Sequence, residues 1–175
     1  MIAKLPGLRD WEFGLNNVSY GLFIPSGMGL WMDDDGCYWL DPTSTGTMNY
    51  LTRITLELRE LGFDEVVFSD FCFPQSSGYV FSGDRYEALS NAAAKLVSSC
   101  GTDSFAISFM STDLDFPLPE GRTRLFLQGI SAVDVRSIVS NIQVADPEIR
   151  VVFYVDSNDT RYDTFSVIRP LANAH

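Results

Sequence analysis

Four aspartates in this sequence have the type and the spacing that acid–base chemistry needs. Asp41, Asp70, Asp113 and Asp156 each lie at or just beyond the carboxyl end of a predicted strand. In a parallel α/β fold these strand ends share one face, and that face carries the active site. Two carboxylates that converge there can hydrolyse a glycosidic bond, one as general acid and the other as nucleophile or base.

We predict two catalytic residues, Asp70 and Asp113, and substrate contacts from Trp39, Asp41, Ser69 and Asp156. A structural interpretation stands beside this one, because Asp after a strand often caps the next helix or closes an Asx turn. Asp41 precedes Pro-Thr-Ser and Asp156 lies in Asp-Ser-Asn-Asp, so both also suit that interpretation. Aromatic side chains such as Trp39 can stack on sugar rings, but near strands they more often belong to the core.

The composition restricts the chemistry further. The single histidine is His175, the last residue, so we expect no Ser-His-Asp triad, no Cys-His pair and no histidine zinc site. The three cysteines, Cys37, Cys72 and Cys100, are far apart and form no metal-type cluster. We therefore expect neither a metal nor a cofactor, and acid–base catalysis by carboxylates, tyrosines or lysines.

The charge of the chain bears on its partners. The formal net charge is −11, whereas nucleic acids and anionic membrane surfaces need a basic face, so we expect neither as a partner. No apolar run is long enough to span a membrane, and the amino terminus does not resemble a signal peptide. A hydrophobic content of 46% is ample for a globular core, and a neutral or cationic ligand suits the charge.

One stretch, Leu61–Pro74 with the sequence LGFDEVVFSDFCFP, shows how these acids are positioned. Gly62 ends a helix, since glycine after the last apolar position is the usual left-handed cap. Residues 65–68 are apolar and rich in β-branched and aromatic side chains, as in a strand buried on both faces. Ser69 and Asp70 follow at its carboxyl end, where α/β enzymes keep their chemistry.

Periodicity and turn signals predict the other elements. Asp33-Asp34-Asp35-Gly36 between two apolar runs indicates a hairpin turn rather than a calcium loop. An apolar stripe predicts a helix from about residue 45 to residue 61, and Asp84 with Glu87 forms a capping box for a second helix that Gly101 ends. Further strands are predicted at residues 104–110, 123–128 and 149–155, with a third helix after residue 131.

This order predicts an α/β fold with a mainly parallel sheet of about five strands. The chain has 175 residues and is expected to form one domain, whereas a full (β/α)₈ barrel needs about 200 residues or more. We therefore predict a partial, TIM-barrel-like domain or a small open α/β sheet. Residues 1–30 are expected to be irregular, with one short extended piece near residues 18–24 and no early barrel strands.

Part of the sequence resembles a bacterial family that is classed with the glycosyl hydrolases and related to the α-amylase-like barrels. The matching residues are Gly29-Leu30-Trp31, Tyr38-Trp39-Leu40-Asp41-Pro42, Tyr50-Leu51, Glu57-Leu58, Leu61-Gly62-Phe63-Asp64-Glu65 and Phe73-Pro74. The resemblance covers about Gly29 to Met110. It implies a (β/α)₈-type barrel, a carbohydrate ligand, and an extracellular or cell-surface location whose signal would lie outside this chain.

The chain departs from the pattern of that family at the acid. Aligned on Phe73-Pro74, the acid of the family falls on Ser69, Asp70 takes an aromatic position, and the arginine falls on Cys72. Alternate strand residues point to opposite faces, so an acid displaced by one position needs a bend at the strand end to reach the same site. The functional alternatives are thus a glycoside hydrolase, a catalytically degenerate carbohydrate-binding domain, and an interaction module that self-associates through open sheet edges.

Overall fold

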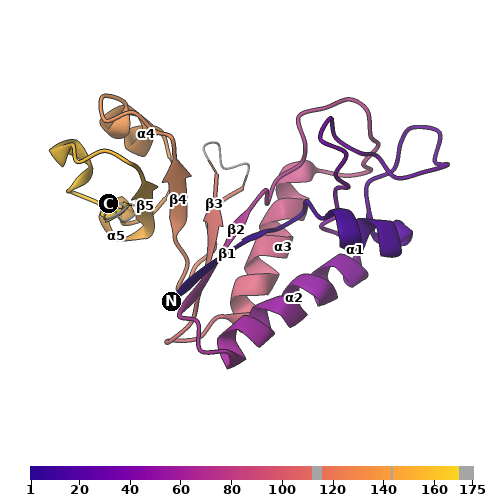
Figure 1. The fold of residues 1–175 in the computed structure, drawn as a ribbon, viewed down its shortest axis with the longest axis horizontal. Coiled ribbons are helices and arrows are strands. Elements are labelled where there is room, and N and C mark those ends of the chain that lie inside the picture. Colours follow the sequence, from indigo (N-terminus) through magenta and orange to yellow (C-terminus); the bar gives the residue numbers. More distant parts are fainter. Residues whose placement is uncertain (112–115, 143, 170–175) are drawn as a thin grey trace, which may run out of the picture.

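The computed structural model describes residues 1–111, 116–142 and 144–169, and Figure 1 shows how their elements are arranged. Strands alternate with helices or turns along the chain. In order, the elements are β1 (Ile2–Pro6), α1 (Trp11–Asn16), η1 (Val18–Tyr20), α2 (Thr45–Glu60), β2 (Glu65–Ser69), α3 (Arg85–Cys100), β3 (Ala106–Met110), β4 (Leu125–Gln128), α4 (Val135–Asn141), α5 (Pro147–Arg150), β5 (Val151–Tyr154), η2 (Thr160–Tyr162) and β6 (Ser166–Ile168).

The six strands form one parallel sheet whose spatial order, β1-β2-β3-β4-β5-β6, is also their order in the chain. Val67 of β2, Phe126 of β4 and Val152 of β5 pack together on one face, although β3 lies between β2 and β4. The sheet therefore curls around this face, as it does in part of a barrel. The predicted partial α/β barrel is confirmed, with six strands in place of the expected five.

The main core lies on the outer face of the curled sheet. Helices α2 and α3 pack against each other and against β2 and β3 (Figure 1). Val66, Phe68, Ile107 and Phe109 point toward them and are essentially inaccessible to solvent. Because the other face of the same strands is also buried at its centre, β2 and β3 read as continuous apolar runs rather than alternating ones.

The two long helices form where the periodicity predicts them. In α2 the buried side chains are Thr47, Met48, Leu51 and Thr55, which recur at intervals of three and four residues. In α3 the Asp84 side chain accepts a hydrogen bond from the Glu87 amide, so the predicted N-cap is confirmed. Gly62 follows α2 with φ of 85°, a left-handed conformation that glycine adopts without a steric penalty.

The amino-terminal segment corrects the sequence prediction. Residues 2–6, expected to be irregular, form edge strand β1, which pairs with β2. The extended piece expected near residues 18–24 is instead the 3₁₀ turn η1 followed by isolated bridges. β1 alternates between exposed and half-buried residues and has no apolar run. It is therefore a strand because it pairs with β2, about 60 residues away in the chain.

The segment between β1 and α2 also differs from the prediction. Trp39 and Leu40, expected to end a strand of the sheet, form only antiparallel bridges to Arg9 and Gly21 and lie outside the sheet. Asp41 therefore does not follow a strand of the parallel sheet. The hairpin turn is confirmed, since the Asp33 amide donates to the Cys37 carbonyl and Gly36 has φ of 77°.

The carboxyl-terminal part supplies a second strand, after β1, that the sequence did not predict. Strands β4 and β5 lie within the predicted ranges. The strand predicted at residues 149–155 starts later than expected, because residues 149 and 150 belong to the short helix α5. The tail forms β6, which pairs in parallel with β5. In the described ranges, no helix is both long enough and apolar enough to cross a membrane.

Candidate functional site

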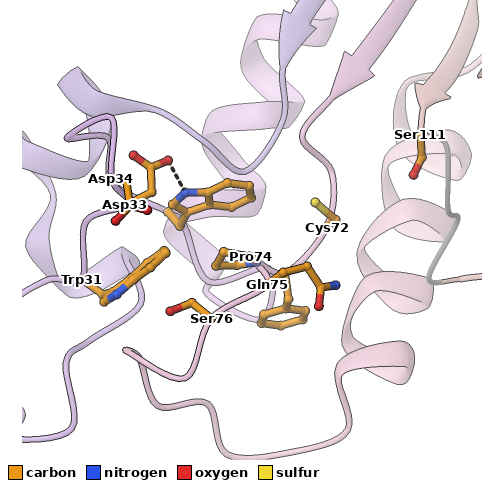
Figure 2. Close-up of a pocket in the computed structure, with 10 residues that line it drawn as sticks. Trp31, Asp33, Asp34, Cys72, Pro74, Gln75, Ser76 and Ser111 are labelled. Atoms are coloured by element: carbon orange, nitrogen blue, oxygen red, sulfur yellow. Dashed lines mark hydrogen bonds between the residues drawn. The ribbon is translucent and has the colours of Figure 1, made fainter. Parts of the chain in front are cut away.

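A cleft of about 470 Å³ opens beyond the carboxyl ends of β2 and β3. Three segments build it: the turn between β1 and α2, the loop that follows β2, and the residue after β3. Figure 2 shows the turn and the loop on one side of the opening and Ser111 on the other. Its lining residues are Trp31, Asp33, Asp34, Trp39, Cys72, Phe73, Pro74, Gln75, Ser76 and Ser111.

Asp33 fixes one wall of the cleft. Its Oδ2 atom accepts hydrogen bonds from Trp39 Nε1 at 2.9 Å (Figure 2) and from Arg9 Nε at 2.7 Å. Its Oδ1 atom accepts from the amides of Asp35 and Cys37. The Arg9 guanidinium and these donors hold the pKa of the Asp33 carboxyl well below its usual value. Asp33 is therefore ionised at neutral pH, where it orients the Trp39 indole and cannot act as a general acid.

Trp31 lies over a glycine in the same cleft. A Cβ atom placed on Gly78 would come within 2.4 Å of Trp31 Nε1, so the indole rests directly on this backbone. The Tyr79 ring lies 5.4 Å from the Trp31 ring at a tilt of 50°. Trp31 is only half-buried, whereas Trp39 is buried, so Trp31 presents the more accessible aromatic surface.

The rings of Phe73 and Tyr79, with Arg85, form a second aromatic group beside the cleft. Phe73, which lines the cleft, is stacked nearly parallel to Tyr79, with 6.4 Å between ring centroids. The guanidinium of Arg85 lies over both rings, at 5.6 Å from Phe73 and 5.0 Å from Tyr79. Such cation–π contacts hold aromatic rings in place. The aromatic wall is thus pre-formed.

Polar groups complete the lining. Asp34, Gln75 and Ser76 are exposed at the cleft (Figure 2). Asp34 forms no hydrogen bond or ion pair with any described residue. These side chains offer carboxylate, amide and hydroxyl groups to a ligand. Within the described ranges, no group of three His, Cys, Asp or Glu side chains is arranged to hold a metal ion.

Asp70 lies at the carboxyl end of β2, immediately before the loop that lines the cleft. It is half-buried, and φ is 52°, a left-handed conformation that Asp tolerates better than most residues. Its carbonyl accepts a hydrogen bond from the Leu8 amide, while its carboxylate has no partner among the described residues. This backbone bend follows Ser69, whose hydroxyl donates to the Leu5 carbonyl. Neither residue lines the cleft itself.

Asp41 and Asp156 do not line this cleft. Asp41 closes an Asx turn, since its Oδ1 atom accepts from the Thr43 amide at 2.8 Å and from the Thr43 hydroxyl at 2.6 Å. Asp156 is exposed and lines a separate hollow of about 440 Å³ with Gln128 and Tyr154, beyond the carboxyl ends of β4 and β5. Asp113 lies outside the described residues.

Sequence reasoning named Trp39 but overlooked the acids next to it. Asp33 and Asp34 were assigned only to a hairpin turn, which is correct for their backbone but incomplete for their side chains. A usable signal was present, because the two tryptophans Trp31 and Trp39 flank this acidic turn. Gln75 gave no such signal, since its position depends on the path of the loop after β2.

The fold places the chain in the class of parallel α/β half-barrels. No family model and no curated protein matches the chain. Among solved structures, it is similar to the crystal structure of a hypothetical protein from Ruminiclostridium thermocellum ATCC 27405. The TM-score is 0.55 with 24% sequence identity over 61% of this chain, and the match spans 56% of the other chain. The chain thus matches just over half the length of that neighbour, and the likeness concerns the fold alone.

Proposed function

We propose that this chain is a glycoside-hydrolase-like domain that binds a segment of polysaccharide in the cleft between Trp31 and Ser111. One observation carries the proposal: an open cleft at the carboxyl ends of parallel strands combines two indole rings with the exposed polar side chains of Asp34 and Gln75. Ligand sites of α/β folds lie at this end of the sheet. Aromatic surface with a few convergent polar groups is the usual lining of small-molecule sites.

The chemistry of the lining suits a neutral sugar. The faces of pyranose rings are apolar and pack on aromatic rings such as Trp31, while their hydroxyls donate to carboxylates such as Asp34 and exchange hydrogen bonds with Gln75. A polyanionic ligand would be repelled, since the net charge is −11 and two aspartates line the cleft.

Hydrolysis is the catalytic form of the same proposal, with Asp70 and Asp113 as the acid pair. What supports Asp70 is its position at the end of β2 next to the cleft loop, together with a carboxylate that is unpaired among the described residues. Asp33 and Asp41 are weaker candidates. Both oxygens of Asp33 already accept hydrogen bonds from Arg9, Trp39 and two backbone amides, and Asp41 closes its own turn.

A binding experiment tests the cleft. Isothermal titration against a panel of soluble neutral oligosaccharides should find at least one ligand for the wild-type chain, and Trp31→Ala should weaken it about tenfold or more, since stacking on an aromatic ring contributes about 1–2 kcal/mol. Trp11→Ala is the matched control, because Trp11 is a half-exposed indole on α1 outside the cleft. Binding that survives Trp31→Ala unchanged would place the ligand elsewhere.

A second experiment separates binding from hydrolysis. The release of reducing ends from the bound glycan is measured for the wild type and for Asp70→Asn, a substitution that keeps the left-handed backbone accessible and removes the charge. Loss of turnover with retained binding supports Asp70 as a catalytic residue. Turnover that Asp70→Asn leaves intact excludes it, and binding without any wild-type turnover identifies a carbohydrate-binding domain.

The open sheet favours a second candidate, an interaction domain that self-associates. Among the strands that the structure describes, β1 and β6 each pair on one side only. The Gly7 amide donates to the Ser69 carbonyl, so the backbone of Gly7 faces β2. Successive residues of a strand direct their backbone groups to opposite sides, so those of Lys4 and Pro6 face the open side of β1. Lysine and proline both oppose strand addition, which leaves β6 as the edge for pairing. Sedimentation equilibrium tests this candidate, and a monomer at all concentrations would exclude it.

A further inference from the structure

A second hollow lies at the opposite end of the sheet from the cleft. It has a volume of about 700 Å³ and is bounded by the first residues of β1, β2, β3 and β6, by α5, and by the segment that leads into β4. Ile2, Glu65, Ala106 and Ser166 mark the strand ends around it. We call it the amino-end hollow.

Cationic side chains gather in the amino-end hollow. Arg122, Arg124 and Arg150 all line it, although the whole chain has only twelve lysines and arginines against 23 acids. Two of the local acids are already neutralised, since Glu65 pairs with Arg124 and Asp64 pairs with the amino group of Met1. Glu148, which is exposed, is the remaining acid of the lining.

Arg122 and Arg150 are in direct contact with no described carboxylate, although Asp64 acts on Arg122 through space, and Asp146 and Glu120 act on Arg150. Arg150 donates from Nε to the Thr123 carbonyl at 3.1 Å and from Nη2 to the Pro119 carbonyl at 2.5 Å. Arg122 donates to the Asp103 carbonyl. Neither forms an ion pair within the described ranges. Carbonyl groups orient a guanidinium without cancelling its charge, and partial burial of Arg150 makes that charge costly, as its lowered pKa reflects.

A buried hydroxyl in the same hollow points to a missing partner. Thr123 lines the hollow and is only 2% exposed. Among the described residues, its Oγ1 atom is the one buried side-chain nitrogen or oxygen without a hydrogen-bond partner. Buried polar atoms are nearly always satisfied in native proteins, so an exception needs an explanation. A bound group that accepts hydrogen bonds would satisfy this hydroxyl.

We propose that the amino-end hollow is an oxyanion-binding site, in which Arg122, Arg150 and Thr123 hold a phosphate group. Phosphate neutralises two positive charges, accepts the paired N–H groups of a guanidinium, and accepts from a hydroxyl. The site is separate from the cleft and does not depend on carbohydrate binding. The group is either free inorganic phosphate or the phosphoryl end of a phosphomonoester, and the hollow has room for both.

The test is a titration with inorganic phosphate, in which binding is measured by isothermal titration calorimetry. A titration with chloride at equal ionic strength is the control. A parallel titration with glycerol 1-phosphate distinguishes a phosphomonoester from the free ion. We expect saturable binding of at least one of the two. Because the chain is strongly acidic, unspecific attraction of anions is weak, so saturation reports a built site.

Variants assign the site. Arg122→Gln and Arg150→Gln should each weaken phosphate binding about tenfold or more, and Thr123→Val should weaken it severalfold. Arg122 is exposed, so Arg122→Gln keeps the test valid even if Arg150→Gln unfolds the chain. Arg53→Gln on the solvent side of α2 is the matched control and should change nothing. The absence of saturable binding, or equal binding by Arg122→Gln, overturns the proposal.

Discussion

At the scale of single residues, one carboxylate determines the geometry of the cleft wall. Asp33 accepts hydrogen bonds from Arg9, from the Trp39 indole and from two backbone amides. Asp33→Asn should therefore destabilise the chain by about 2 kcal/mol, because hydrogen bonds to a charged, partly buried group contribute more than neutral ones. Urea unfolding measures this. Asp35→Asn is the control and should have almost no effect, since Asp35 is 84% exposed in its ion pair with Arg9.

The same carboxylate makes a prediction about pH. The folded-state pKa of Asp33 lies below its ordinary value of 3.8, so the folded state binds the proton less tightly than the unfolded state. The stabilisation is thus present above that ordinary value and is lost as the pH falls through the folded-state pKa. Unfolding measured from neutral pH downward should show a smaller loss of stability in Asp33→Asn than in the wild type. Parallel curves for the two proteins would contradict the assignment.

Gly78 gives a residue-scale test of the cleft that does not touch a ligand group. A methyl group on Gly78 would meet Trp31 Nε1 at 2.4 Å, so Gly78→Ala must displace the indole. We expect glycan affinity to fall about tenfold while the unfolding free energy changes little, because Trp31 is at the surface. Gly29→Ala is the matched control, since its added carbon would have only Ile24 at 4.0 Å. Unchanged affinity in Gly78→Ala would separate Trp31 from the binding site.

Residue type was predictable from the sequence, but side-chain direction was not. The position of Asp70 after a buried strand follows from the pattern EVVFSD, whereas its left-handed backbone does not. That bend sets where the carboxylate points. It is accompanied by contacts with Leu5 of β1, a strand that the sequence did not reveal, and with Leu8 shortly after it. Asp41 shows the same limit, because the amide and the hydroxyl of Thr43 both donate to its Oδ1 atom and turn the carboxylate toward its own backbone.

At the scale of elements, two helix caps of the same residue type make a matched comparison. Asp84 accepts from the Glu87 amide at the start of α3, whereas Asp134 at the start of α4 forms no side-chain cap bond. Asp84→Ala should cost about 1 kcal/mol of stability. Asp134→Ala should cost only a few tenths of a kcal/mol, since no capping bond is lost. Chemical denaturation of both variants checks the difference, and equal losses would mean that the Asp84 cap is not the cause.

Elements with strong local patterns were predictable, and those held by distant partners were not. Helices α2 and α3 and strands β2 and β3 have periodic stripes, caps or unbroken apolar runs. Edge strand β1 has five residues and edge strand β6 has three, and no side chain in either strand is fully buried. Both segments are therefore strands because they pair with β2 and β5. Local propensity cannot report such pairing, because it depends on residues far away in the chain.

At the scale of the whole molecule, a polar layer sits inside the curled sheet. Glu65 of β2 is only 2% exposed, accepts from the Ser108 hydroxyl of β3 at 2.5 Å, and pairs with Arg124 before β4. The Arg124 amide in turn donates to Ser108 Oγ at 2.9 Å. Three successive segments of the sheet are joined at one point, between the amino-end hollow and the apolar layer that contains Val67. The sequence hid this layer, since residues 65–68 were predicted as a buried strand without any sign that Ser108 and Arg124 are the partners of Glu65.

This layer makes the last prediction, which concerns the cohesion of the sheet. Arg124→Met leaves a buried, unpaired carboxylate on Glu65 and should cost about 3 kcal/mol. Glu65→Gln leaves Arg124 able to reach solvent, because its side chain is 33% exposed, and should cost less. The double variant Glu65→Gln with Arg124→Met should be more stable than Arg124→Met alone, since it removes the unpaired charge. A double-mutant cycle by urea unfolding measures the coupling. Additive losses would show that the two side chains act independently, and the curl of the sheet would then rest on the apolar layer of Val67, Phe126 and Val152 alone.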